Sequence, residues 1–140
     1  MIDPAEELQN AAYARLTTGV ATINYPVYDY GNVPKSTEIN YITIGNVHSI
    51  SWNSKEEPGT NTILTFHLWS NVKDKQYVND MKNAVLGSIT VIDDGDSYSA
   101  LSLTSFNVIR QDFDNSDVPF EDSSGAYHGI LTMSFLLEQK

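Results

Sequence analysis

A change of hydrophobic period near the middle of the chain predicts a β-strand followed closely by an α-helix. Leu64, Phe66 and Leu68 alternate with polar or aromatic residues, which places these three on one face of a strand. Farther along, apolar residues recur at the spacing of a helix with one buried stripe. The residues of this predicted stripe are Tyr77, Val78, Met81, Val85 and Leu86.

Candidate capping residues flank the predicted helix. Ser70 or Asn71 supplies a side-chain acceptor for its first free N–H groups. Gly87 can adopt the left-handed conformation that ends a helix. A strand and an amphipathic helix bury both apolar faces only when the helix folds back onto the sheet, so we expect this segment to form the core.

The first part of the chain predicts a short helix and then extended chain. Asp3 can cap the helix, Pro4 suits its first turn, and 17–19 (Thr-Thr-Gly) ends it. Pro26 and Pro34 then predict extended chain or an edge strand. The residues expected to face the core from the helix are Leu8, Ala12 and Leu16.

The rest of the chain reads as strands joined by turns. Residues 40–52 predict a long strand with a bulge or bend at Gly45, and 53–61 a loop between antiparallel neighbours. Ser88 to Ile92 predicts a short strand, and the Asp-Gly pair at 94–95 predicts a hairpin turn. We expect a strand over 98–110, an acidic loop over 111–125, and a closing strand over 127–137 with Leu131, Met133, Phe135 and Leu137 on one face.

These elements predict an α+β fold. We expect a mainly antiparallel sheet of about four to five strands, with two helices packed on one face. The length of 140 residues fits one domain over 1–140.

Composition and charge narrow the range of possible functions. The chain has no cysteine, no apolar run long enough to span a membrane, and an acidic start unlike a signal peptide. Its net charge is −10, and its eight Lys and Arg residues are scattered along the chain. We therefore expect no membrane association and no direct recognition of nucleic acid.

The candidates for chemistry are common residue types without a diagnostic spacing. His48, His67 and His128 fall on three predicted strands and could converge on zinc, but half-exposed strand histidines explain them as well. The acids around Gly95 lack the ligand pattern of a calcium loop. We expect no catalytic residue, no metal site and no cofactor, and hence no enzyme.

Aromatic residues in extended segments are the candidates for binding. Tyr25, Tyr28 and Tyr30 could stack on a ligand or partner, or cover the edge of the core. Phe113 and Phe120 lie among the acids of the predicted 111–125 loop, and apolar residues in such a loop need a partner.

The order of these segments resembles the tail completion proteins of long-tailed bacteriophages, also called tail terminators or tail-to-head joining proteins. The likeness runs from EELQNAAYARL and VYDYGNVP through NYITIGN and TFHLWSNVKDKQYVNDMKNAVL to SLTSFNVIRQDFD and AYHGILTMSFLLEQ. Asn40 stands where this family usually has a Pro before the Tyr.

The resemblance implies a virion structural protein at the head-proximal end of the tail, made in the host cytoplasm. Such a protein caps the finished tail tube as a ring, commonly a hexamer, and joins it to the neck connector of the DNA-filled head. The implied partners are further copies of itself, the tail tube protein and the connector, while DNA passes without specific binding. We expect Tyr28, Tyr30, Phe113 and Phe120 to be contact residues, because aromatic side chains carry much of the binding energy of interfaces.

Three alternatives remain at this level. The chain could be another head–tail neck component, such as a head-closure or adaptor protein. It could be a small ligand-binding or enzymatic α+β domain, which would show a concave pocket with convergent polar groups and shifted pKa values. It could also be an interaction module unrelated to phages.

Overall fold

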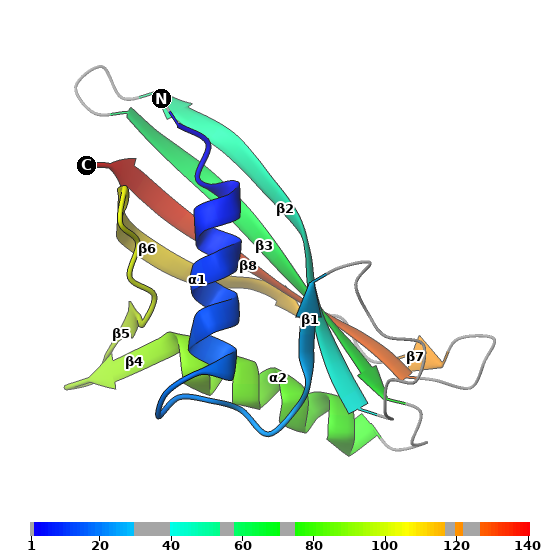
Figure 1. Cartoon of the computed structure of the whole chain (residues 1–140). Helices are drawn as coiled ribbons and strands as arrows, with labels where there is room; N and C mark the ends of the chain where they lie inside the picture. The colour runs from blue at the N-terminus through cyan, green and yellow to red at the C-terminus, as the bar shows by residue number, and fades with distance from the viewer. Residues whose placement is uncertain (1, 30–39, 54–57, 71–74, 117–119, 122–126) are drawn as a thin grey trace.

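The computed structural model describes residues 2–29, 40–53, 58–70, 75–116, 120–121 and 127–140. Within these residues the chain forms two helices and eight strands, shown in Figure 1. The helices are α1 (Ala5–Thr17) and α2 (Lys75–Ile89). The strands are β1 (Val27–Asp29), β2 (Asn40–Asn53), β3 (Pro58–Ser70), β4 (Thr90–Asp93), β5 (Asp96–Ser99), β6 (Phe106–Ser116), β7 (Phe120–Glu121) and β8 (Tyr127–Gln139).

The main sheet has the strand order β1-β2-β3-β8-β6, and β7 pairs with β8 beyond the end of β6. Strands β3 and β8 are its centre and pair from Gly59↔Glu138 to Ser70↔Tyr127. All neighbouring strands are antiparallel except β1 and β2. The prediction of a mainly antiparallel α+β fold is confirmed, although the main sheet has six strands in place of four to five.

Both helices pack on one face of this sheet, with α1 crossing in front of it and α2 below α1 (Figure 1). The predicted inward faces of the central strands are confirmed, since Leu64, Phe66 and Phe135 are 0% exposed. Removing these side chains from water supplies the main drive for folding. The core also contains Leu8, Ala12, Leu16, Ile42, Ile44, Leu68, Val78, Met81, Val85, Ile89, Leu131, Met133 and Leu137.

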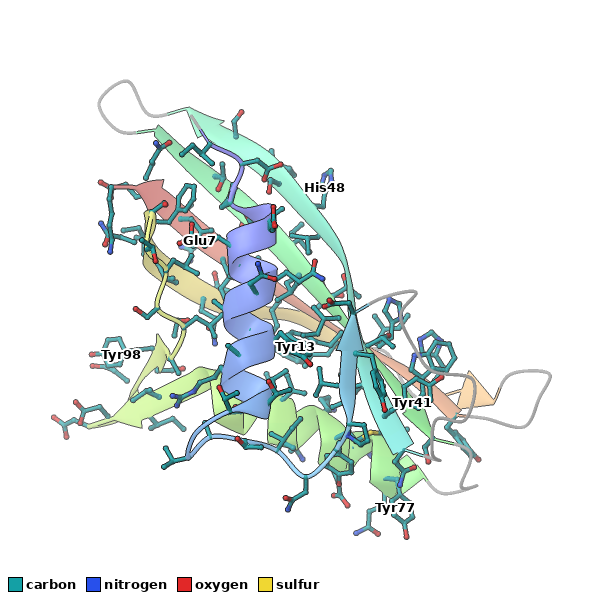
Figure 2. The ribbon with its side chains drawn as sticks, viewed as in Figure 1. Glu7, Tyr13, Tyr41, His48, Tyr77 and Tyr98 are labelled. Atoms are coloured by element: carbon teal, nitrogen blue, oxygen red, sulfur yellow. The ribbon has the colours of Figure 1, made fainter. Side chains whose placement is uncertain are left out.

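Helix α1 begins and ends as predicted to within one residue. The carboxylate of Asp3 accepts the N–H of Ala5 at 3.0 Å and the hydroxyl of Ser49 at 3.0 Å, which joins the helix start to β2. One carboxylate oxygen of Glu7 accepts the N–H groups of Thr104 and Ser105, at 2.5 and 2.9 Å. These bonds hold the chain before β6 against α1, as Figure 2 shows for Glu7.

Helix α2 differs from the prediction at both ends. It begins only at Lys75, so Ser70, the last residue of β3, is not its N-cap, and Asn71 lies outside the described residues. Gly87 lies inside the helix, which continues to Ile89. The physical reason is that the buried stripe repeats once more, since Ile89 follows Val85 by one helical turn and is 0% exposed.

Other side chains of α2 also differ from the predicted stripe. Tyr77 is 40% exposed and does not belong to the buried face, whereas Leu86 is partly buried against the core.

The end of the helix is fixed by Ser88. Its backbone C=O accepts Nε–H of Arg15 at 2.8 Å, and its hydroxyl donates to the C=O of Ala21 at 2.8 Å. Residues from both helices therefore meet at this corner.

The predicted bulge near Gly45 is confirmed. Gly45 pairs with Thr65, but the next paired residue of β2, His48, is opposite Ile63. One extra residue on β2 is thus accommodated, and this increases the local twist of the strand. The prediction of a loop over 53–61 is wrong at both ends, because β2 extends to Asn53 and β3 begins at Pro58, with Thr60 and Thr62 buried. Residues 54–57 lie outside the described residues.

The Asp-Gly hairpin is confirmed and forms a sheet of its own. Asp94 and Gly95 have φ angles of 50° and 84°, the two left-handed positions of a type I′ turn. They join β4 to β5, with Val91 opposite Tyr98 and Asp93 opposite Asp96. The short strand predicted at 88–92 begins at Thr90, after the end of α2.

The prediction for 98–125 is wrong in two respects. Residues 100–105 are not in a strand, so the expected strand over 98–110 is divided between β5 and β6. Residues 111–116 continue β6 and do not belong to a loop, and β7 also lies within the predicted loop. An edge strand can carry acids because its outward side chains reach water, and such charges discourage unwanted pairing.

Neither helix in the described part of the chain is long and apolar enough to cross a lipid bilayer.

Candidate interaction surfaces

A row of aromatic side chains crosses the sheet on the face away from the helices. Strand pairing creates the row, because Tyr41 lies opposite Trp69 and Trp69 lies opposite His128. The Trp69 and His128 rings stack with centroids 3.8 Å apart and an angle of 7° between planes. Tyr41 stacks on the other side of Trp69 at 6.2 Å, and Tyr28 meets Tyr41 edge to face at 6.2 Å.

Two of the three histidines converge within this row, and the third does not. His67 Nδ1 and His128 Nε2 are 2.8 Å apart and share a hydrogen bond. His48 is exposed on β2 (Figure 2). Among the described residues no group of three or more His, Cys, Asp or Glu side chains is placed to hold a metal ion.

Burial favours the neutral form of His67. Its side chain is 9% exposed, and this burial lowers its pKa below the ordinary value because a charged imidazolium loses hydration there. The bond to His128 requires one ring nitrogen to accept a proton, and it is lost when both rings are protonated. The hydrogen bond between His67 and His128 is therefore expected at neutral pH and not at a pH where both rings are protonated.

Stability is expected to fall as the pH is lowered through the histidine range. The unfolded chain protonates His67 at about pH 6.5, whereas the folded chain does so only at lower pH. The stabilisation is thus complete above about pH 6.5 and is lost as the pH falls toward the folded pKa. Urea unfolding measured between pH 5 and 8 gives the free energy of unfolding at each pH. This free energy should depend less on pH in His67→Gln than in the unchanged protein.

The matched control for this experiment is His48→Gln, which replaces an exposed histidine. We expect this variant to retain the pH dependence of the unchanged protein. Equal pH dependence in His67→Gln and His48→Gln would contradict the assignment to His67.

A groove lies on the opposite, helix-bearing side of the sheet, between the β4–β5 hairpin and β6. Its first part has a volume of about 480 Å³ and is lined mainly by apolar side chains, including Leu86, Ile92, Phe113 and Met133. Its second part, about 680 Å³, runs between β5 and β6 and is also lined by Ser97, Gln111 and Phe113. The two parts are adjacent and share these three residues, and together we call them the hairpin groove.

The described residues with shifted pKa values lie outside the hairpin groove. Burial raises the pKa of Tyr25 and lowers the pKa of His67, which lies in the aromatic row on the other face of the sheet. Gln111 Nε2 donates to Thr90 Oγ1 at 3.1 Å, whereas Gln111 Oε1 is buried without a hydrogen-bond partner in the described residues. The mainly apolar lining makes the hairpin groove a candidate surface for contact with a partner.

Comparison with solved structures shows a likeness of fold. The chain is similar to a chain in the structure named "Virion of native gene transfer agent (GTA) particle", with a TM-score of 0.77 over 99% of each chain. Sequence identity is 16%, so the likeness concerns the fold. No protein-family model matches the sequence, and no curated protein matches it.

The structure places two of the four predicted contact side chains. Phe113 is 50% exposed on β6 and lines the hairpin groove. Tyr28 is partly buried at the end of the aromatic row. Tyr30 lies outside the described residues, and Phe120 is described only by its backbone pairing with His128 in β7.

The sequence analysis did not single out the apolar side chains of the β4–β5 hairpin as candidate contacts. Its signal was present, because Val91, Ile92 and Tyr98 flank an Asp-Gly turn. These side chains are 42%, 78% and 54% exposed, and Figure 2 shows Tyr98 on the outside of the molecule. Period alone could not reveal that the hairpin stands apart from the main sheet.

Proposed function

We propose that this protein is a virion structural protein that caps the completed tail tube and joins the tail to the DNA-filled head. The observation that carries the proposal is the fold likeness over 99% of both chains to a chain of a gene transfer agent virion. It agrees with the sequence resemblance to tail completion proteins, which rests on the order and spacing of segments along the same chain. In this role the protein is a binding component and not an enzyme.

A closed ring is the form in which the protein would act. In a ring of identical subunits each copy uses two different surfaces, one for each neighbour. Tyr28, Tyr30, Phe113 and Phe120 are the proposed contacts with neighbours, the tail tube protein or the neck connector. A ring of copies that each carry a net charge of −10 would repel the DNA backbone, so DNA could slide through without adhering.

Electron microscopy of particles from a strain lacking this gene tests the proposal. We expect over-long tube polymers, or tails of normal length that do not join heads. Normal infectious particles would contradict it. Loss of another neck component would also leave tails of normal length that do not join heads, so over-long tube polymers are the result that separates the two roles.

Alanine at Phe113 is expected to reduce head–tail joining while the protein stays folded. An exposed aromatic side chain at the centre of an interface contributes about 1–2 kcal/mol or more, so joining affinity should fall roughly tenfold. The measurement is the yield of joined particles when purified protein complements extracts from the deletion strain. Tyr13→Ala, at a 40% exposed tyrosine of α1, is the matched control and should complement fully.

A further inference from the structure

Exposed apolar side chains gather around the hairpin groove. Half of the large apolar side chains that are exposed in the described residues lie on β4, β5 and β6. An isolated two-stranded hairpin is marginally stable in water, and a concentration of exposed apolar side chains marks an interaction site. The five side chains are Val91, Ile92, Tyr98, Ile109 and Phe113, and all except Val91 line the hairpin groove.

Two strand edges face this groove. In the described residues, one edge of β6 pairs with β8, and β7 pairs with β8 as well. No described strand pairs with the other edge of β6. Strand β5 likewise pairs only with β4, and it runs beside β6. Unpaired backbone N–H and C=O groups on such edges are a template for an added strand.

The rim of the groove is acidic. Asp93, Asp94 and Asp96 surround the turn of the hairpin, and Asp112 lies on β6. The basic residue of β6, Arg110, is already engaged, because its Nε donates to Asp112 at 2.6 Å. A partner that approaches the turn of the hairpin therefore meets carboxylates that are not neutralised by a described ion pair.

We propose that the hairpin groove binds an extended segment of another protein in which apolar and basic residues alternate. The segment adds to the open edge of β6 as a strand. Its apolar side chains, which all point to one side of a strand, enter the part of the groove lined by Leu86, Ile92, Phe113 and Met133. Its Lys or Arg side chains reach the acidic rim.

Charge argues against a second copy of this chain as the occupant. In the strands that the structure describes, Arg110 is the single Lys or Arg, so no such strand could offer alternating basic residues. Two copies would also bring together chains that each carry a net charge of −10. A basic segment from a different protein meets no such repulsion.

NMR titration of the purified protein tests this proposal without reference to tails or heads. The probe is a six-residue peptide of alternating Val and Lys with both ends blocked. We expect saturable shifts of the backbone amide signals of Ile92, Ser97, Gln111 and Phe113, and weaker binding as salt is raised. A Val–Glu peptide and a Val–Lys peptide with alternate amides N-methylated, which cannot donate to a strand edge, should not bind.

Variants locate the binding. Asp94→Asn with Asp96→Asn removes two rim charges while keeping a residue that tolerates the left-handed position 94, and should weaken binding at least threefold. Ile92→Asp should abolish it. Ile50→Asp, at a 50% exposed side chain of β2 outside the groove, is the matched control and should bind normally.

Three results would overturn the proposal. The Val–Glu peptide could bind as tightly as the Val–Lys peptide, or the shifts could fall on the aromatic row. The groove signals could also move with protein concentration alone, which would identify a second copy as the occupant. Since the proposed function is tested by the particles of the deletion strain, either idea can fail while the other stands.

Discussion

Replacing Phe135 by Ala is expected to lower the free energy of unfolding by about 3–5 kcal/mol. Phe135 is 0% exposed in β8 and lies between Thr62 of β3 and Gln111 of β6. The substitution loses the transfer free energy of the ring and leaves a cavity that the two helices and the sheet cannot close fully. Because small domains have about 5–15 kcal/mol of stability, a large share would be lost.

Urea unfolding followed by circular dichroism measures this loss. The midpoint should fall while the dependence of free energy on urea stays unchanged. Phe113→Ala is the matched control, because it removes the same side chain from the neighbouring strand at a position that is 50% exposed. Its cost should stay within about 1 kcal/mol. Similar losses for both variants would contradict the assignment of the buried face.

Replacing Gly129 by Ala is expected to cost about 1–3 kcal/mol, although it adds only one methyl group. Gly129 lies in β8 opposite Leu68, where α2 approaches the sheet. A Cβ atom at this position would overlap Cγ1 of Val78 on α2. The helix must then move away from the sheet or Val78 must change rotamer, and either change disturbs the packing around it.

The substitution Val78→Ala tests directly whether the Cβ atom added at position 129 overlaps Val78. It removes the overlapping methyl group, so the double variant should be more stable than the sum of the two single losses by about 1 kcal/mol. Gly87→Ala is the control, because a Cβ atom there meets nothing within 4 Å and Ala favours a helix interior by about 0.5–1 kcal/mol. Additive losses at positions 78 and 129 would refute the close approach of α2 to β8.

Much of the fold could be predicted from local pattern. The alternation that ends in Leu68 and the alternation in β8 both have the period of a strand, and their apolar residues are buried as expected. The Asp94-Gly95 turn needed no distant contact, because its left-handed backbone angles follow from these two residue types. The N-terminal helix could also be predicted from the spacing of Leu8, Ala12 and Leu16, which are buried.

The errors came where distant contacts outweigh local preference. Gly87 is a good helix terminator, yet α2 continues because burying Ile89 stabilises a further turn. The acids of 111–116 suggested a loop, yet this stretch is a strand because β8 offers its edge for backbone pairing. Glu7 fixes the approach to β6 from a position far away in sequence.

The candidate sites divide in the same way. The sequence by itself determined the α+β class, the buried face of each central strand, the hairpin turn and the acidic character, because these depend on residue type and spacing. Only the tertiary structure decided that His67 meets His128 while His48 does not, and that the hairpin faces β6 across a groove. Strand register and the packing of separate elements set these distances, and neither is encoded in a local period.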